Sequence, residues 1–202
     1  MAGTFTHWMI VEEALDELTN SSGAPKYFAK ILGKNHFVVL GAAGPDYPYL
    51  NEILLNLFKH HSWADRMHYE KVDSFVIQAM RNLLRRRGED FDICLAWLCG
   101  YVSHVIADTV IHPVVNAIVG PYIFNADEHR HCEMIQDSFI FHHITGNEIR
   151  YAAPEDKGGG YLWLLKMCSD PGDEDRIHPA IRSFWSETLQ QSHPGGDRKS
   201  VV

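Results

Sequence analysis

The stretch Gly100-Tyr-Val-Ser-His-Val-Ile-Ala-Asp-Thr-Val-Ile-His-Pro113 decides how this chain folds and what it can hold. It places His104, Asp108 and His112 four residues apart within an otherwise apolar segment. Each four-residue step along a helix turns the side chain by about 40°, so the three groups share one face. A buried imidazole or carboxylate is costly unless something pairs with it. The segment therefore predicts a buried helix whose polar stripe binds a cation.

A second cluster follows in Glu128-His-Arg-His-Cys-Glu-Met-Ile-Gln-Asp137, where His129, Glu133 and Asp137 again stand four apart. Imidazole and carboxylate ligands without cysteine suit zinc, and suit iron or manganese less well. Either cluster alone is more typical of a His–carboxylate pair along one helix, or of a helix cap. Both together, one of them inside an apolar helix, indicate a metal site.

Length and composition favour one globular domain. The chain has 202 residues, of which 46% are apolar and 22% charged, so we expect a domain over residues 1–192 and a mobile tail over 193–202. The net charge of −8 disfavours a general nucleic-acid coat protein. The four cysteines lack Cys-x-x-Cys spacing and are expected to be free thiols. Neither a signal peptide nor a run of about 20 apolar residues is seen, which favours a cytoplasmic protein without a transmembrane segment.

Apolar residues recur mostly at helical spacing, so the expected fold is all-α, built around the central buried helix. Thr4 or Thr6 is expected to cap the first helix, and Pro113 to end the central one. Residues 41–48 are expected to form a loop. The expected helices are residues 4–18, 25–32, 50–60, 67–87, 90–112, 127–142, 161–168 and 179–191.

Three further polar residues are weak candidates when each is taken alone. His7 lies on the inner side of the first helix, Asp46 lies in a Gly-Pro-Asp-Tyr stretch, and His68 precedes Tyr69. Their order along the chain, followed by the two clusters, resembles the zinc-dependent phospholipase C family. That superfamily also holds the single-strand-specific fungal nucleases and the phospholipase domain that cleaves glycosylphosphatidylinositol anchors. The likeness runs from His7 to Asp137.

The resemblance implies an all-α fold that holds three zinc ions, or two, and it implies their ligands. Family members ligate zinc through the amine of the N-terminal residue, so removal of Met1 would make Ala2 a ligand. The number of residues between Asp46 and His60 or His61 is closer to the corresponding interval in the bacterial phospholipase of this family. His68 is nevertheless preferred, because an aromatic residue follows it. The implied ligands are Asp46, His68, His104 and Asp108 for one zinc, Asp108, His7 and Ala2 for the second, and His112, His129 and Glu133 for the third.

The resemblance also implies the chemistry. A zinc-bound hydroxide would hydrolyse a phosphodiester or phosphomonoester, with Asp46 as general base and Tyr47 near the substrate head group. The substrate would be a phospholipid head group or a small phosphodiester. Two alternatives stay open: a single-strand nuclease or nucleotidase-type phosphoesterase, and a non-catalytic, zinc-stabilised binding domain. A ferritin-like oxidase would require Glu-x-x-His on paired helices, and the sequence has no such pair. The oligomeric state stays open.

Overall fold

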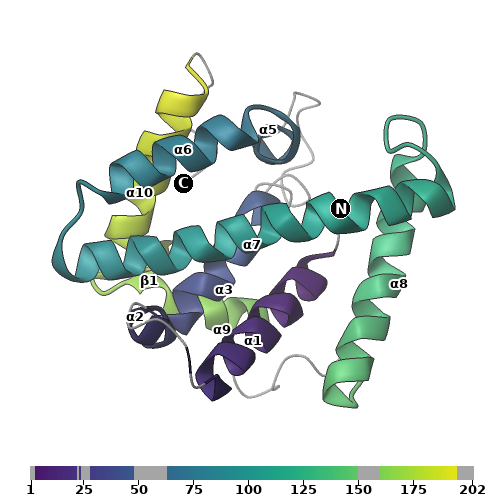
Figure 1. The fold of residues 1–202 in the computed structure, drawn as a ribbon, viewed down its shortest axis with the longest axis horizontal. Helices are drawn as coiled ribbons and strands as arrows, with labels where there is room; N and C mark the ends of the chain where they lie inside the picture. Colours follow the sequence, from purple (N-terminus) through teal and green to yellow (C-terminus); the bar gives the residue numbers. More distant parts are fainter. Residues whose placement is uncertain (1–2, 22, 24–27, 48–62, 150–159, 195–202) are drawn as a thin grey trace.

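The computed structural model describes residues 3–21, 23, 28–47, 63–149 and 160–194, and nearly all of them are helical, which confirms the all-α prediction (Figure 1). A two-stranded antiparallel hairpin of β1 and β2 accompanies the helices. The elements in chain order are α1 (Thr4–Asn20), α2 (Phe28–Leu32), α3 (Asn35–Ala43), η1 (Gly44–Asp46), α5 (Trp63–Tyr69), α6 (Val72–Leu83), α7 (Gly88–Val119), α8 (Ala126–Thr145), α9 (Gly160–Met167), β1 (Ser169–Asp170), β2 (Asp173–Ile177) and α10 (Pro179–Ser192).

Helix α7 runs through the middle of the molecule and packs against helices from both halves of the chain (Figure 1). Its first half is mostly buried after the exposed first turn, with Trp97 and Tyr101 fully inside the core. The central buried helix is therefore confirmed for this half. In its second half one side is exposed, and this side carries Ile106, Val110, Val114 and Ile118.

Two glycines let α3 and α7 approach until their backbones touch. A Cβ at Gly100 would collide with the Val38 carbonyl oxygen, and a Cβ at Gly41 would collide with the Trp97 carbonyl oxygen. This contact brings the end of α3 and the short helix η1 beside the His104 turn of α7. The predicted loop over residues 41–48 is wrong in its first part, because residues 41–46 are buried and helical. A buried segment must pair its own backbone groups, and helical turns do so locally.

Pro113 lies inside α7 instead of ending it, so the predicted boundary at His112 is wrong. Proline removes one helical hydrogen bond, the one that would reach the carbonyl of Thr109. Thr109 and Pro113 are both exposed, so water can solvate the freed carbonyl and the helix continues.

The helix expected over residues 67–87 is two helices, because Lys71 adopts a left-handed conformation with φ 52°. A left-handed residue ends a helix, and here it separates α5 from α6. The helix expected over residues 50–60 lies outside the described residues. So do residues 195–202 of the expected tail, whereas His193 is buried and its Nε2 donates to the Glu70 carbonyl at 2.9 Å. The four cysteines are free thiols, as expected.

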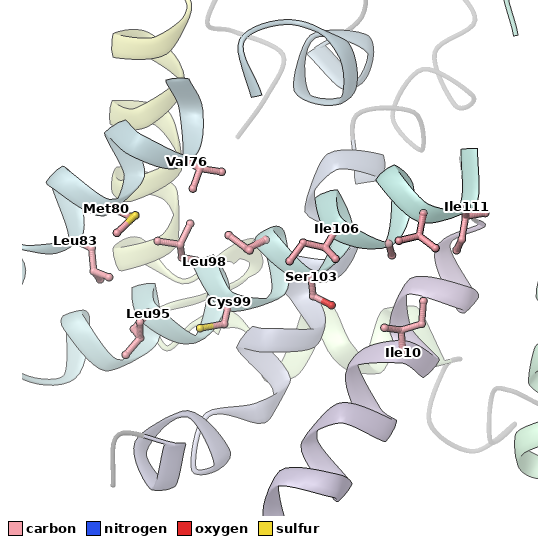
Figure 2. Close-up of a pocket in the computed structure, with 13 residues that line it drawn as sticks. Ile10, Val76, Met80, Leu83, Leu95, Leu98, Cys99, Ser103, Ile106 and Ile111 are labelled. Atoms are coloured by element: carbon pink, nitrogen blue, oxygen red, sulfur yellow. The ribbon is translucent and has the colours of Figure 1, made fainter. Parts of the chain in front are cut away.

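An open apolar groove of about 770 Å³ lies along α7, between α6 and α1 (Figure 2). Its lining residues are Ile10 of α1, Val76, Met80 and Leu83 of α6, and Leu95, Leu98, Cys99, Val102, Ser103, Ile106, Ala107, Val110 and Ile111 of α7. Helix α7 is also long and apolar enough to cross a membrane by length and composition, which the sequence analysis did not anticipate. Half of the qualifying window is buried in the fold, and central helices of folded domains meet the same criterion.

Candidate metal centre

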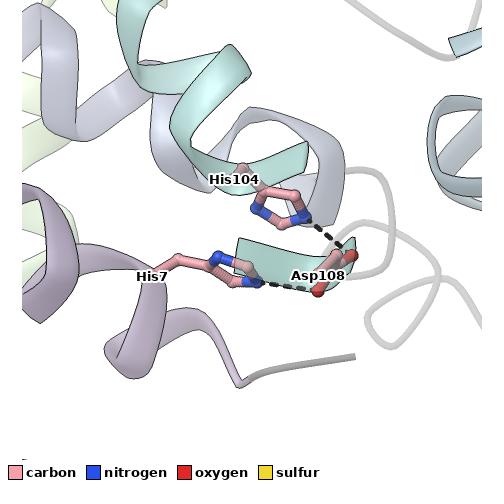
Figure 3. Close-up of side chains that lie close together, drawn as sticks. All are labelled: His7, His104 and Asp108. Atoms are coloured by element: carbon pink, nitrogen blue, oxygen red, sulfur yellow. Dashed lines mark ion pairs between the residues drawn. The ribbon is translucent and has the colours of Figure 1, made fainter. Parts of the chain in front are cut away.

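The polar stripe of α7 forms the middle of a cluster of histidines around one carboxylate. His104 and His112 lie on either side of Asp108 along the helix, with their Nε2 atoms 3.5 Å and 3.4 Å from its Oδ2. His7 reaches the same carboxylate from α1, with Nε2 3.3 Å from Oδ1 (Figure 3). His68 completes the set from α5, with Nε2 3.7 Å from Oδ2. One carboxylate thus faces four imidazoles from three helices.

A second carboxylate enters from the turn that follows α3. Asp46 ends η1 and is buried, and its Oδ1 lies 3.3 Å from His68 Nε2. The Nε2 atoms of His68 and His104 are 3.0 Å apart. Two trios therefore have their ligand atoms within 4.8 Å of one another: His7 with His104 and Asp108, and Asp46 with His68 and His104.

The backbone of α3 sets the tautomer of His104. Its Nδ1 lies 2.7 Å from the Ala42 carbonyl oxygen, which can only accept, so Nδ1 carries the proton. The neutral ring then presents the lone pair of Nε2 to the cluster. His7 stacks on the same ring, with centroids 3.6 Å apart and planes 15° from parallel. A ring oriented by a backbone carbonyl behind it is typical of metal-binding histidines.

Several buried ring nitrogens in and near this cluster have no hydrogen-bond partner among the described residues. They are Nδ1 of His7 and of His129, and Nε2 of His7 and of His112, which lie 3.3 Å and 3.4 Å from Asp108 but outside hydrogen-bond geometry. An unpaired buried polar atom is costly, and a cation is the partner that neutral imidazoles and carboxylates jointly accept. Nitrogen and oxygen donors without sulfur fit zinc. The residues present therefore fit the metal that the sequence indicates.

The electrostatics of the cluster keep its carboxylates ionised and its central histidine neutral. Burial alone would raise the pKa of Asp46, but His104, His68 and His7 lower it to about 2. Burial would likewise raise the pKa of Asp108, and the surrounding histidines, His104 foremost, lower it far below its usual range. Burial and the neighbouring His7 lower the pKa of His104. Deprotonated carboxylates and a neutral imidazole are the forms that bind metal.

The third predicted ligand group lies near this cluster but is more open. His112 is next to Asp108, as given above. His129 is buried on α8, and its Nε2 donates to the Gly120 carbonyl at 2.6 Å, so Nδ1 is the nitrogen whose lone pair could bind a metal. Burial raises the pKa of the half-buried Glu133, and the charge of Asp46 adds to the rise. Among the described residues, His112, His129 and Glu133 do not form a third trio with the 4.8 Å spacing.

The first turn of α1 contributes contacts that the sequence analysis missed. Thr4 and Thr6 were expected to cap this helix, but Gly3 occupies the cap position and neither threonine caps it. The Thr4 hydroxyl donates to Asp46 Oδ2 at 3.0 Å, and the Thr6 hydroxyl donates to Asp137 Oδ1 at 2.7 Å. The only sequence signal for these contacts was the regular spacing of Asp137 behind His129 and Glu133.

A small cavity of about 260 Å³ opens beside the cluster. Its lining combines ligand candidates with apolar side chains: Met67, His68, Tyr69, Val72, His104, Val105, Asp108, Thr109 and His112. None of these lining residues is Lys or Arg. Tyr69 is half exposed, and its ring lies against His112 with centroids 6.1 Å apart.

Comparison with known families agrees with this donor set. The family model described as zinc dependent phospholipase C matches residues 6–195, a range that contains every described residue of the cluster. The chain belongs to this family. No protein of curated function and no solved structure matches the chain.

The zinc-dependent phospholipase C family is zinc-dependent, and the two His and Asp groups of this chain could hold metal ions. Some expected site residues cannot be placed, because Ala2, His60 and His61 lie outside the described residues. Tyr47 is half-buried and packs edge-on against Trp185, with centroids 6.2 Å apart. Its expected role near the substrate head group stays a prediction.

Proposed function

We propose that this chain is a zinc-dependent phosphoester hydrolase of the phospholipase C type. One observation carries the proposal: two trios of metal-ligating groups share His104, and the Asp108 carboxylate lies between histidines of both. A carboxylate has two oxygens, so Asp108, which lies between the two ligand sets, could bridge two metal ions. A helix cap or a single buried ion pair would not need four imidazoles around one carboxylate.

The proposed ligand sets follow the geometry where the residues are described. Asp46, His68, His104 and Asp108 would hold one zinc ion. His7 and Asp108 would hold a second, with Ala2 as the proposed further ligand. His112, His129 and Glu133 would hold a third, and because they do not form a trio within 4.8 Å, we expect this ion to dissociate most readily.

Bound zinc supplies Lewis acidity and lowers the pKa of a coordinated water toward 7. The residues of this chain supply the rest. Asp46 is ionised at neutral pH, and the Thr4 hydroxyl orients its Oδ2. Oδ1 faces His68 and the cluster, so Asp46 is the proposed acceptor for the proton of the attacking water.

The cavity favours a compact phosphoester as substrate. Its volume of about 260 Å³ is small for a ligand pocket, and a head group fits such a space better than a polynucleotide does. Binding of single-stranded nucleic acid depends on basic side chains beside aromatic ones, and the described residues of the lining include Tyr69 but neither Lys nor Arg. Met67, Val72 and Val105 offer an apolar wall to the group attached to the phosphate. A phosphodiester with one charge, such as a phospholipid head group, is therefore the proposed substrate.

The test is hydrolysis by the zinc-loaded chain of a chromogenic phosphodiester, phosphatidylcholine micelles and single-stranded DNA, each with and without a chelator. We expect the first two to be cleaved and the chelator to abolish cleavage. Asp46→Asn should lower kcat by roughly 100-fold or more, whereas Asp90→Asn, at an exposed carboxylate on α7, should leave it unchanged. Zinc-loaded protein that cleaves none of the three substrates would favour a non-catalytic binding domain.

A further inference from the structure

Asp137 of α8 is a buried carboxylate that binds the first turn of α1. Its Oδ1 accepts hydrogen bonds from the Thr6 amide at 2.8 Å and from the Thr6 hydroxyl at 2.7 Å. Its Oδ2 accepts from the Phe5 amide at 3.3 Å. Both oxygens are therefore occupied by donors from α1, and the two helices are joined at this point.

These contacts replace the cap that α1 lacks. The first amides of a helix have no partner within the helix, and a side chain at the cap position usually accepts from them. Gly3 holds that position here, and it has no side chain to offer. A Cβ on Gly3 would collide with the Asp137 carboxylate, so glycine is what allows this carboxylate to approach. A negative charge at a helix N-terminus is also favourable for the helix dipole.

The capped turn is the one that carries a metal-ligand candidate. His7 directly follows Thr6, is fully buried, and reaches Asp108 while stacking on His104. Thr4 in the same turn donates to Asp46. If the first turn of α1 were to fray, His7 would lose the direction that points it at the cluster.

We propose that Asp137 is a positioning residue of the metal centre, capping α1 from α8 and thereby holding His7 against Asp108. The metal ion that His7 binds then depends on the docking of α8 onto α1. Asp137 itself is not a ligand in this account, because donors from α1 engage both of its oxygens. The proposal rests on the zinc centre proposed above, but it does not depend on hydrolysis.

The test is zinc binding by isothermal titration with the full chain, wild type against Asp137→Ala. We expect one zinc ion per chain to be lost or bound about 10- to 100-fold more weakly, the range typical when a residue that orients a metal ligand is removed. His7→Ala should give the same loss. Adding Asp137→Ala to His7→Ala should change zinc binding no further, because the first residue acts through the second.

A matched control separates positioning from simple destabilisation. His178 caps α10, where its Nδ1 accepts from the Ala180 amide at 3.2 Å. His178→Ala removes a cap elsewhere in the fold, so it should lower the melting temperature and leave zinc binding unchanged. Thr6→Val keeps the amide and loses only the hydroxyl, so it provides a milder variant if Asp137→Ala does not fold, with an intermediate loss of zinc affinity expected.

Unchanged zinc affinity and stoichiometry in both Asp137→Ala and Thr6→Val would overturn the proposal. A loss in the Asp137→Ala, His7→Ala double variant larger than in His7→Ala alone would overturn it too, since Asp137 would then act elsewhere. A wild-type chain that binds zinc and hydrolyses nothing would contradict the proposed function, and the role of Asp137 could still be measured by titration.

Discussion

Asp108 is the residue on which the proposed site depends most. Its two oxygens lie within 3.7 Å of ring nitrogens from His7, His68, His104 and His112. Asp108→Asn keeps the shape of the side chain and removes the negative charge. We expect zinc affinity to fall by about 100-fold or more, because the variant loses a ligand shared by two ions. Competition with a chelating dye measures this, and affinity within a few-fold of wild type would contradict the shared-ligand role.

His104 makes the stability of the metal-free protein depend on pH. Burial and His7 lower its pKa in the folded state. A lowered pKa means that the unfolded chain binds the proton more tightly, so folding is favoured above the ordinary value of 6.5 and weakened as pH falls below it. Urea unfolding of the metal-free protein should show this loss of stability between about pH 8 and pH 5, a range that spans the ordinary pKa of histidine. His104→Gln should flatten the curve, and an equally steep curve in that variant would contradict the assignment.

The α7 stripe was predictable because it depends only on helical geometry and the cost of burying polar groups. Spacing alone places His104, Asp108 and His112 on one face. The contacts of Thr4, Thr6 and the Ala42 carbonyl were not predictable, because they join residues far apart in the sequence. Threonine near a helix start usually caps its own helix, and nothing local shows that a carboxylate from another helix will take that place.

At the scale of elements, the crossing of α3 and α7 places Asp46 and the Ala42 carbonyl beside His104. Gly100→Ala would put a methyl group against the Val38 carbonyl and force the helices apart. We expect the free energy of unfolding to fall by about 3 kcal/mol or more, with weaker zinc binding. Gly23→Ala is the control, because no atom of the described residues lies within 4 Å of its added Cβ. Equal stability of the two variants in urea would argue against the close crossing.

Pro113 shows how tertiary context overrides a local rule. The ring removes a helical hydrogen bond, yet α7 continues to Val119 because the affected turn is exposed. Pro113→Ala should therefore raise the free energy of unfolding, by up to about 3 kcal/mol. Urea unfolding of the metal-free variant measures the change. A variant less stable than wild type would show that the proline ring makes a stabilising contact.

Two predictions from the sequence were wrong for a related reason: one continuous helix across Lys71, and a loop over residues 41–46. Gly, Pro and Asp in residues 41–46 are typical of turns, and the periodicity of residues 67–87 is typical of one continuous helix. Residues 41–46 are helical where they pack against α7, and the left-handed conformation of Lys71 separates α5 from α6. The sequence pattern predicted helix over residues 67–87 and missed only its break, whereas it predicted no helix over residues 35–46, where α3 and η1 lie.

At the scale of the whole molecule, the proposed ligands come from α1, η1, α5, α7 and α8, so bound metal should hold these elements together and stabilise the fold. Zinc at 100 times its dissociation constant should stabilise the fold by about 2.7 kcal/mol per site. For a chain of this size that corresponds to a rise of roughly 5–10 °C in melting temperature. Calorimetry with and without zinc measures it. Magnesium, which prefers oxygen ligands in octahedral geometry, should have little effect, and an equal rise with magnesium would contradict a nitrogen-rich site.

The most direct test of the central claim is the number of zinc ions bound per chain. Native mass spectrometry of untagged protein, loaded with zinc and then desalted, measures it without reference to any substrate. The account predicts about three ions per chain, or two if the ion at His112, His129 and Glu133 dissociates during desalting. A chain that retains less than one zinc ion would contradict it.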